Sequence, residues 1–215
     1  MTTFSPIFFW DDYINNHPDL SLALVHTKTS THHHYENHGY REKRNLYGNS
    51  YKFMLHQGTL FSVPPYINTI DPIFRQVDVH DNCQIAIKQY FESGLAITRK
   101  LQKLLLENDI TTGSGLVCAG YGHASRHFTK IIPGIKFSFF DTNNDRMVFM
   151  SEYLKCKVDK DVSLKEKYKV IVLNDFFSTI TDPSFWLCKL FSILDKSGCI
   201  VFIDNGEILN HIIKR

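Results

Sequence analysis

Residues 116–122 read Leu-Val-Cys-Ala-Gly-Tyr-Gly, an apolar run that ends in two glycines. A continuously apolar run is typical of a strand covered on both faces, and glycine after it permits a tight turn. The chain then repeats this pattern. Helical segments near 124–132, 144–154 and 183–195 alternate with apolar runs at 135–140, 168–173 and 199–203. Alternating strands and helices predict an α/β fold with a mostly parallel sheet flanked by helices.

The residues upstream of this alternation divide into a long helix and a less regular segment. Apolar residues recur every three or four positions from 82 to 108, which predicts one amphipathic helix. Residues 1–80 are rich in aromatic residues, His, Asn and Pro, and the stretch 51–63 fits a hairpin turned at Gly58. We therefore predict an irregular N-terminal extension over 1–80 that caps the substrate. A ligand-binding domain follows over 81–215 and includes the joining helix.

Composition and charge exclude several classes of protein. The chain has 24 Lys+Arg and 22 Asp+Glu, a net charge of +2, which is too small for the electrostatic footprint of a nucleic-acid binder. No run of about 18 apolar residues exists, so no transmembrane helix is expected. The first ten residues lack the basic region of a secretory signal. Five widely spaced cysteines without a CxxC motif indicate a reducing compartment, so we expect a cytoplasmic protein with no membrane partner.

Candidate ligand-binding residues lie where three predicted strands end. Ligands bind beyond the carboxyl ends of parallel strands. Gly120 and Gly122 follow the first strand, Asp141 ends the second, and Asn174 and Asp175 end the third. Asp141 lies 21 residues after Gly120, a spacing at which an acidic side chain can accept the hydroxyl hydrogens of a ribose. This combination predicts a nucleoside-containing ligand, and the alternative is a sheet that has lost its site.

Four motifs resemble those of class I S-adenosylmethionine (SAM)-dependent methyltransferases, whose sheet is Rossmann-like. They are the glycine-rich motif at 117–122, Phe-Ser-Phe-Phe-Asp at 137–141, Tyr-Lys-Val-Ile-Val-Leu-Asn-Asp at 168–175 and Leu-Asp-Lys-Ser-Gly at 194–198. The resemblance implies SAM as the cofactor, with Asp141 at its ribose. It implies cofactor contacts for Ala119, Gly120, Tyr121, Gly122, Asp141, Thr142, Asn174, Asp175 and Phe176.

The sequence departs from the family pattern at three places. Cys118 stands where the family usually has an acidic residue. The third glycine is replaced by Ala124, or by Ser125 if the looser GxGxxG spacing is counted. After the last predicted strand, residues 206–215 are predicted to form one short helix instead of the family's final pair of strands. The C-terminal edge of the sheet is then shortened to five strands, or it is completed by the N-terminal part or by a partner chain. A homodimer is therefore one of the alternatives that the sequence leaves open.

The function that the resemblance implies is transfer of a methyl group from SAM to a small-molecule acceptor. The near-neutral charge and the aromatic N-terminal part favour a small acceptor over nucleic acid. The alternatives on the same fold are an aminocarboxypropyl-type transferase that also uses SAM, a nicotinamide-dependent oxidoreductase, and a non-catalytic methyltransferase-like subunit. The sequence identifies no catalytic base and no particular acceptor.

A histidine-rich stretch at 31–39 reads Thr-His-His-His-Tyr-Glu-Asn-His-Gly and suggests a metal site at first sight. Imidazole is a ligand for zinc, nickel and copper. Adjacent histidines rarely face one centre, however, and the spacing matches no zinc signature. We therefore predict a polar loop without a metal, and a lid over the substrate pocket is the alternative.

Overall fold

The computed structural model describes residues 7–22, 27–39, 41–69, 71–78, 82–118, 120–159, 166–174, 176–204 and 207–214. Tertiary contacts divide the chain into an N-terminal unit, Met1–Phe91, and a C-terminal unit, Glu92–Arg215. Helix α6 (Cys83–Glu107) belongs to both, and it confirms the long helix predicted over 82–108. Among the described residues, none of the helices has the length and apolar character needed to cross a bilayer.

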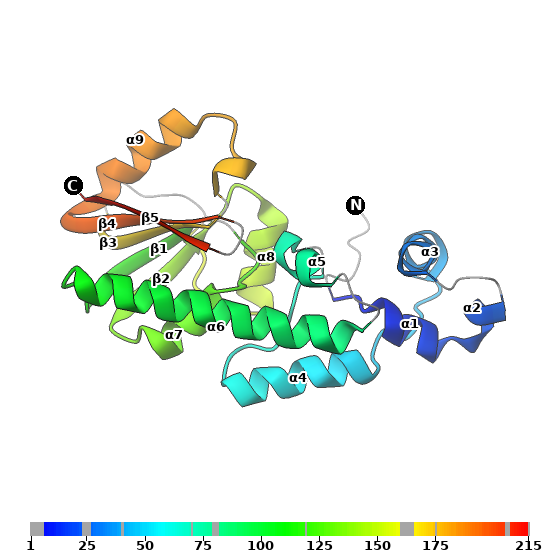
Figure 1. Cartoon of the computed structure of the whole chain (residues 1–215). Coiled ribbons are helices and arrows are strands. Elements are labelled where there is room, and N and C mark those ends of the chain that lie inside the picture. The colour runs from blue at the N-terminus through cyan, green and yellow to red at the C-terminus, as the bar shows by residue number, and fades with distance from the viewer. Residues whose placement is uncertain are drawn as a thin grey trace. The chain divides into compact units, whose positions relative to one another are not determined.

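The C-terminal unit contains a five-stranded sheet with the strand order β2-β1-β3-β4-β5. Strands β1 (Gly113–Cys118), β2 (Ile135–Phe140), β3 (Tyr168–Asn174) and β4 (Leu194–Asp204) pair in parallel, as Figure 1 shows. The predicted α/β class with a Rossmann-like, mostly parallel sheet is confirmed. Because the chain goes from β1 to β2 on one side and then to β3 on the other, the strand order reverses between β1 and β3. Ligands bind at such a point.

The helices of this unit begin at the caps that the sequence indicates. The side chain of Asn143 accepts hydrogen bonds from the backbone at the start of α8 (Asn144–Glu152). Asp182 caps α9 (Pro183–Ile193), with Pro183 in the first turn. That helix ends two residues earlier than predicted, because Leu194 adopts extended backbone angles and pairs with Tyr168 of β3. The segment after β1 contains a short 3-10 turn, η2 (Ser125–His127), and then α7 (Phe128–Ile131).

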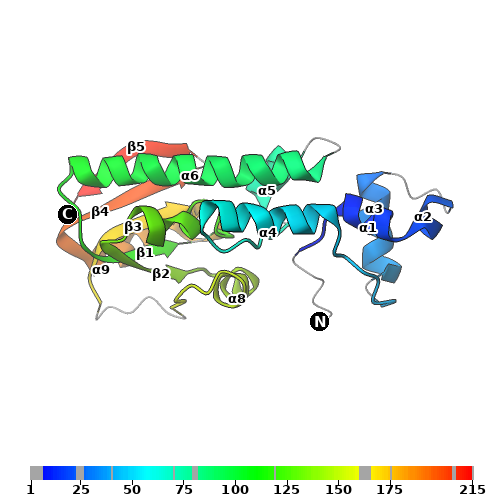
Figure 2. The same cartoon turned by 90° about the horizontal axis from the view of Figure 1, so that it is seen from below.

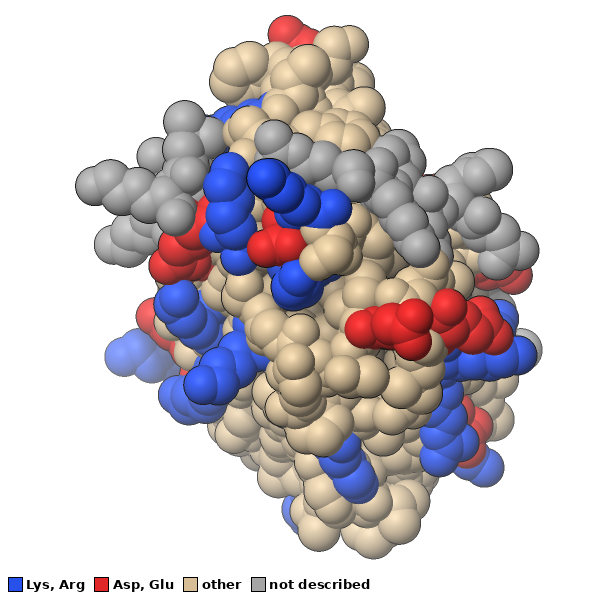
Figure 3. Space-filling model, turned by 90° about the vertical axis from the view of Figure 1, so that its left-hand side faces the viewer, with Lys and Arg blue, Asp and Glu red and all other residues tan. Residues whose placement is uncertain are grey.

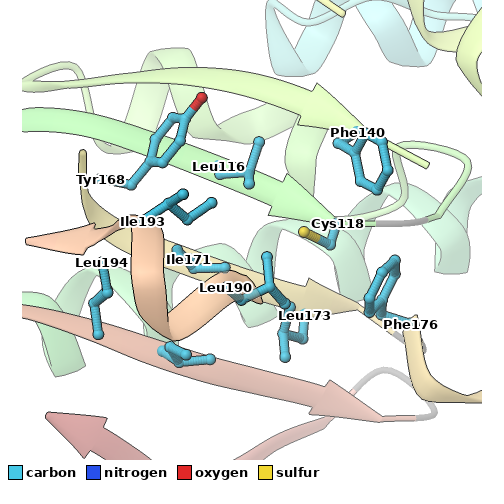
Figure 4. Packing of buried hydrophobic residues seen from close by; sticks show 11 residues of the cluster. Leu116, Cys118, Phe140, Tyr168, Ile171, Leu173, Phe176, Leu190, Ile193 and Leu194 are labelled. Atoms are coloured by element: carbon cyan, nitrogen blue, oxygen red, sulfur yellow. The ribbon is translucent and has the colours of Figure 1, made fainter. Parts of the chain in front are cut away.

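Apolar side chains cover both faces of the sheet. Helix α9 lies on the opposite face from α6 in Figure 1 and Figure 2. Figure 4 shows the core on the α9 side, which consists of Leu116, Cys118, Phe140, Tyr168, Ile171, Leu173, Phe176, Leu190, Ile193, Leu194 and Ile200. On the other face the rings of Phe128 and Phe137 lie 4.8 Å apart. Burial on both faces explains why the strands are apolar throughout.

The last described segment corrects one prediction. Residues 207–214 form a strand, β5 (Glu207–Lys214), that pairs antiparallel with β4, and not the predicted helix. The apolar positions 208, 209, 212 and 213 have a helix-like spacing. Pairing with the edge of β4 satisfies the backbone groups of both strands, and this tertiary contact overrides the local pattern.

The N-terminal unit is helical. It contains α1 (Trp10–Asn16), α2 (Pro18–Leu22), α3 (Lys28–His34), η1 (Tyr35–Gly39), α4 (Asn49–Phe61) and α5 (Pro72–Val77), followed by the first part of α6. The predicted hairpin at 51–63 is wrong, because residues 51–61 lie in α4 and Ser62 is its C-cap. Gly58 makes no turn there. It packs against Pro65 so closely that a Cβ at this position would overlap the proline ring.

The histidine-rich stretch is helical too, which corrects the prediction of a polar loop. It begins in α3 and continues into η1, a π-helix. A capping box starts α3, in which Ser30 N–H donates to Thr27 Oγ1 over 3.1 Å and Thr27 N–H donates to Ser30 Oγ over 3.0 Å. The hydroxyl of Tyr13 lies 3.0 Å from Nδ1 of His34 and fixes the end of the helix.

A buried acid joins distant parts of this unit. Asp12 is 2% exposed. Its carboxylate accepts the backbone N–H groups of Gly48, Ser50 and Tyr51 at 3.0, 2.9 and 2.7 Å. These groups lie at the N-terminus of α4, where they have no partner within the helix. A residue of α1 therefore caps α4 from far away in the sequence.

Candidate functional site

The loop after β1 turns through two glycines with left-handed backbone angles. The φ angle is 100° at Gly120 and 84° at Gly122. Side chains are also excluded by space, since a Cβ on Gly120 would overlap the side chain of Asn174, and one on Gly122 would overlap Leu154. Both glycines are therefore required. The close approach brings the backbone of the loop against Asn174 at the end of β3.

Asp141 follows β2 directly and is 4% exposed. Its Oδ1 accepts the N–H of Asn143 over 2.8 Å, and its Oδ2 lies 3.4 Å from Nη1 of Arg146 in α8. Burial raises the pKa of Asp141, whereas the backbone of Asn143, the Arg146 charge and the backbone of Gly120 oppose this rise. The carboxyl group therefore connects the end of β2 to the glycine loop.

Arg146 was not singled out from the sequence, yet it lies at the centre of this arrangement. Its guanidinium carbon lies 5.0 Å from the centre of the Tyr121 ring, which is a cation–π distance. The same group pairs with Asp141. The sequence did contain one signal for Arg146, which is its position in the first turn of α8, the helix that follows Asp141. Arg146 thus holds the tyrosine of the loop and the acid of β2 together.

A small crevice opens beside Asp141. Its volume is about 10 Å³, and its wall consists of Val117, Gly120, Phe139, Phe140, Asp141, Met147, Met150 and Val158. This is room for about one water molecule. The wall is apolar apart from the single acid. An aromatic base could enter only if side chains of α8 moved, and the two methionines are flexible enough to do so.

Helix α6 supports the glycine loop from its other side. Ser93 Oγ lies 2.8 Å from Nε2 of His123, and Thr98 Oγ1 donates to the carbonyl of Ala124 over 2.9 Å. The helix approaches so closely that a Cβ on Gly94 would overlap the carbonyl oxygen of His123. These contacts depend on α6, which lies before β1 in the sequence. The motif of the loop alone therefore does not predict them.

A buried cation also holds the loop. Arg126 is 2% exposed, and its Nε donates to the carbonyl of Gly122 over 2.8 Å. Cys118, at the position where the family usually has an acid, is fully buried in the core on the α9 side, and burial raises the pKa of its thiol. Cys118 is therefore a core residue in this fold.

The structure brings four of the predicted residues together at the carboxyl edge of the sheet, namely Gly120, Gly122, Asp141 and Asn174. Tyr121 is buried against Arg146, and Thr142 is exposed beside Asp141. Phe176 packs in the core on the α9 side, with its ring centre 5.6 Å from that of Trp186. Ala119 and Asp175 lie outside the described residues. The roles of these residues toward a cofactor stay predictions.

Side chains of the histidine-rich helix contact groups of the same helix. Asn37 Nδ2 donates to the carbonyl oxygen of His33 over 2.8 Å, and the rings of His34 and His38 lie 5.2 Å apart. Within the described parts of the chain, no group of three or more His, Cys, Asp or Glu side chains is placed to hold a metal ion.

Comparison with known proteins finds similarity at the level of structure. No protein-family model and no curated protein matches the sequence. The plantazolicin methyltransferase BpumL, solved with a monoazolic desmethylPZN analog and SAH, matches with a TM-score of 0.47 and 18% identity over 72% of this chain and 58% of its own. A SAM-dependent methyltransferase from Clostridium acetobutylicum matches with a TM-score of 0.42 and 18% identity, over 72% of this chain and 57% of its own.

The sugar N-methyltransferase KedS8 from Streptoalloteichus matches with a TM-score of 0.37 and 14% identity, over 51% of this chain and 47% of its own. All three proteins are methyltransferases by name. This chain thus spans about half to three fifths of the length of each of these structures.

Proposed function

We propose that this chain is a SAM-dependent methyltransferase that acts on a small-molecule acceptor. One observation carries the proposal. The Gly120 backbone, the Asp141 carboxyl and the Asn174 side chain meet at the ends of β1, β2 and β3, where the strand order reverses. This is where an open α/β sheet binds a nucleoside-containing ligand.

The residues present fit this cofactor on two grounds. Gly120 and Gly122 carry no side chain and have left-handed backbone angles, so the backbone of the loop can approach a ligand closely. Asp141 is a buried acid whose carboxylate has more acceptor positions than its present partners use. In this proposal Asp141 accepts the ribose hydroxyls, and Gly120 and Gly122 form the wall beside the methionine part. The crevice at Met147 and Met150 takes the adenine.

When bound, the cofactor supplies a methyl group on a positively charged sulfur that is its own leaving group. The chain then has three tasks, which are to hold the ribose at Asp141, to orient the acceptor beside Asn174, and to exclude water. A general base is needed only where the acceptor must lose a proton. The proposal therefore assigns positioning roles to these residues and names no base.

A small acceptor is supported by the distribution of charge. The net charge is +2. On the face drawn in Figure 3, Lys and Arg side chains are interspersed with Asp and Glu and do not gather into one basic area. A nucleic-acid substrate would call for such an area. All five cysteines are free thiols, which supports the proposal of a reducing, cytoplasmic location.

Calorimetric titration tests the proposal. The purified chain is titrated with SAM and S-adenosylhomocysteine, and with NADH and ATP for comparison. We expect selective binding of the first pair. In the Asp141→Ala variant, affinity for S-adenosylhomocysteine should fall by about 1–3 kcal/mol, the size of a lost charge-assisted hydrogen bond.

The matched control is Asp145→Ala, which removes an exposed acid from the first turn of α8. It should bind as the unchanged chain does. Binding of NADH alone would overturn the proposal. An unchanged affinity of a folded Asp141→Ala variant would remove the ribose role of Asp141.

A further inference from the structure

A cavity of about 460 Å³ lies within the N-terminal unit. Sites for small ligands have volumes of about 300–1,000 Å³. Its wall comes from Phe8 and Thr69, from α3 and η1, and from Arg75 of α5 and its C-cap Asp78. Every described residue of this wall belongs to the N-terminal unit. The cavity is therefore a second concave site, separate from the one proposed for the cofactor.

The charged groups in this wall balance one another. Lys28 and Arg75 are cations, and Glu36 and Asp78 are acids. A ligand with a net charge would bring into the cavity one charge without an opposite partner. An unpaired charge away from water has a high free energy. The wall is thus suited to a ligand that carries one positive and one negative group.

Asp78 shows what the positive end of such a ligand would contact. Its side chain is 7% exposed. Lys28 Nζ pairs with Oδ2 and also donates to the Asp78 carbonyl over 2.7 Å. The other carboxylate oxygen, Oδ1, is buried and has no hydrogen-bond partner among the described residues. Buried carboxylate oxygens nearly always accept a hydrogen bond. An ammonium group of a ligand would supply the missing donor.

Arg75 offers the contact for the negative end. It lies in the last turn of α5, three residues before Asp78, and its side chain is exposed. Lys28 pairs with Asp78, whereas Arg44 pairs with Asp19 and Glu42. The guanidinium of Arg75 has the fork of donors that binds a carboxylate with two hydrogen bonds. The two ends of the ligand would therefore meet neighbouring side chains.

Phe8, His32 and His33 add aromatic rings to the wall, and Thr29 and Thr69 add hydroxyl groups. The Phe8 ring lies 4.6 Å from the His32 ring and stacks on Tyr35 at 4.4 Å. Burial and the charge of Lys28 lower the pKa of His32 against the opposing charge of Glu36, which favours the neutral imidazole. His32 lies in the last turn of α3, where the chain passes into the π-helix η1. Such turns are frequent at functional sites.

We propose that this cavity binds a small zwitterion of the α-amino acid type. The ammonium group donates to Asp78 Oδ1, the carboxylate accepts from Arg75, and an apolar side chain packs against Phe8 and His32. The inference goes beyond methyl transfer and requires no cofactor. A negative result for this cavity therefore leaves the proposed cofactor site untouched, and a negative result for the cofactor site leaves this proposal untouched.

Calorimetry of the full chain without SAM tests the proposal with three probes that share one ring. L-Phenylalanine carries both charges, 3-phenylpropionate has only the carboxylate, and 2-phenylethylamine has only the ammonium group. We expect phenylalanine to bind at least about tenfold tighter than either of the others, because each charge-assisted contact contributes about that factor. Equal affinities, a carboxylate that binds as tightly as phenylalanine, or no binding of phenylalanine would overturn the proposal.

Two variants assign the ends of the ligand. In Arg75→Met, phenylalanine should bind no tighter than 2-phenylethylamine. In Asp78→Asn, it should bind no tighter than 3-phenylpropionate. Arg41→Met, an exposed cation of the same unit outside the cavity wall, is the control and should leave all three affinities unchanged. Because Asp78 also pairs with Lys28, circular dichroism checks that the Asp78→Asn variant is folded. If it is not folded, the Arg75→Met variant, which changes an exposed side chain, decides the question.

Discussion

The carboxyl edge of the sheet and the N-terminal helical unit position their polar groups in different ways. At the sheet edge the backbone positions the polar groups, because strand order and two left-handed glycines bring the loop, Asp141 and Asn174 together. In the N-terminal unit, contacts between side chains and groups distant in sequence position the polar groups. Asp12 caps α4, and Lys28 reaches Asp78. The first region should therefore be sensitive to changes of shape, and the second to the loss of single charged groups.

The largest expected effect is the loss of the distant cap in Asp12→Ala. Three backbone N–H groups at the start of α4 would lose their acceptor in a buried place. We expect the free energy of unfolding to fall by about 3 kcal/mol, more than for an ordinary exposed cap. Urea denaturation followed by circular dichroism measures it.

Asp19→Ala is the matched control for this variant. Asp19 is an acid of the same unit that pairs with Arg44 at the surface, and its removal should cause no measurable change. If Asp12→Ala were as stable as Asp19→Ala, the N-terminal unit would not depend on single buried charges, and the contrast between the two regions would fail.

The second effect tests the sensitivity of the glycine loop to shape. Replacing glycine by alanine within a helix normally stabilises it by up to about 1 kcal/mol. In Gly94→Ala the new methyl group would meet the carbonyl oxygen of His123, a backbone atom that cannot rotate away. We expect a net loss of about 2 kcal/mol, as for an overpacked core, together with weaker binding of S-adenosylhomocysteine.

Thermal unfolding and calorimetric titration measure the two effects. Lys100→Ala, at an exposed position of the same helix, is the control and should retain the normal stability and affinity. A stabilised Gly94→Ala variant would mean that α6 does not press on the loop.

The smallest effect is a pH dependence that originates at Asp141. Burial raises the pKa of this carboxyl in the folded chain. The folded state therefore keeps a proton to higher pH than the unfolded state, and stability falls as the pH rises from the ordinary Asp value of 3.8 through the folded value. Asp141→Asn should flatten this decline.

Urea denaturation between pH 4 and pH 7 compares the two slopes. Asp145→Asn is the control and should decline as the unchanged chain does. Identical slopes for the unchanged chain and Asp141→Asn would show that burial does not act on the titration of Asp141.

The parts of the fold that the sequence predicts correctly are those with local signals. The apolar runs of β1, β2 and β3 need no distant information, and Asn143 and Asp182 cap the helices that follow them. For the same reason, the order of strands is enough to bring Gly120 and Asp141 to one edge.

The errors have a common cause, which is contact with a distant element. Gly58 looks like a turn in the sequence, but its role is to let Pro65 approach α4. The residues of β5 have a helical spacing until they meet the edge of β4. Arg146 and the Ser93–His123 contact were missed because they depend on how α8 and α6 approach the loop. Tertiary packing decides such positions, and no short motif contains that information.

The position of β1 in the sheet has a consequence for hydrogen exchange. β1 pairs with β2 along its whole length and with β3 from Gly115 to Cys118. Amide hydrogens in a strand bonded on both sides exchange with solvent only in large-scale opening of the structure. The glycine loop is therefore attached to backbone that stays closed through local fluctuations. Any movement of the loop on binding has to take place within the loop and α8, while the strand beneath it keeps its place.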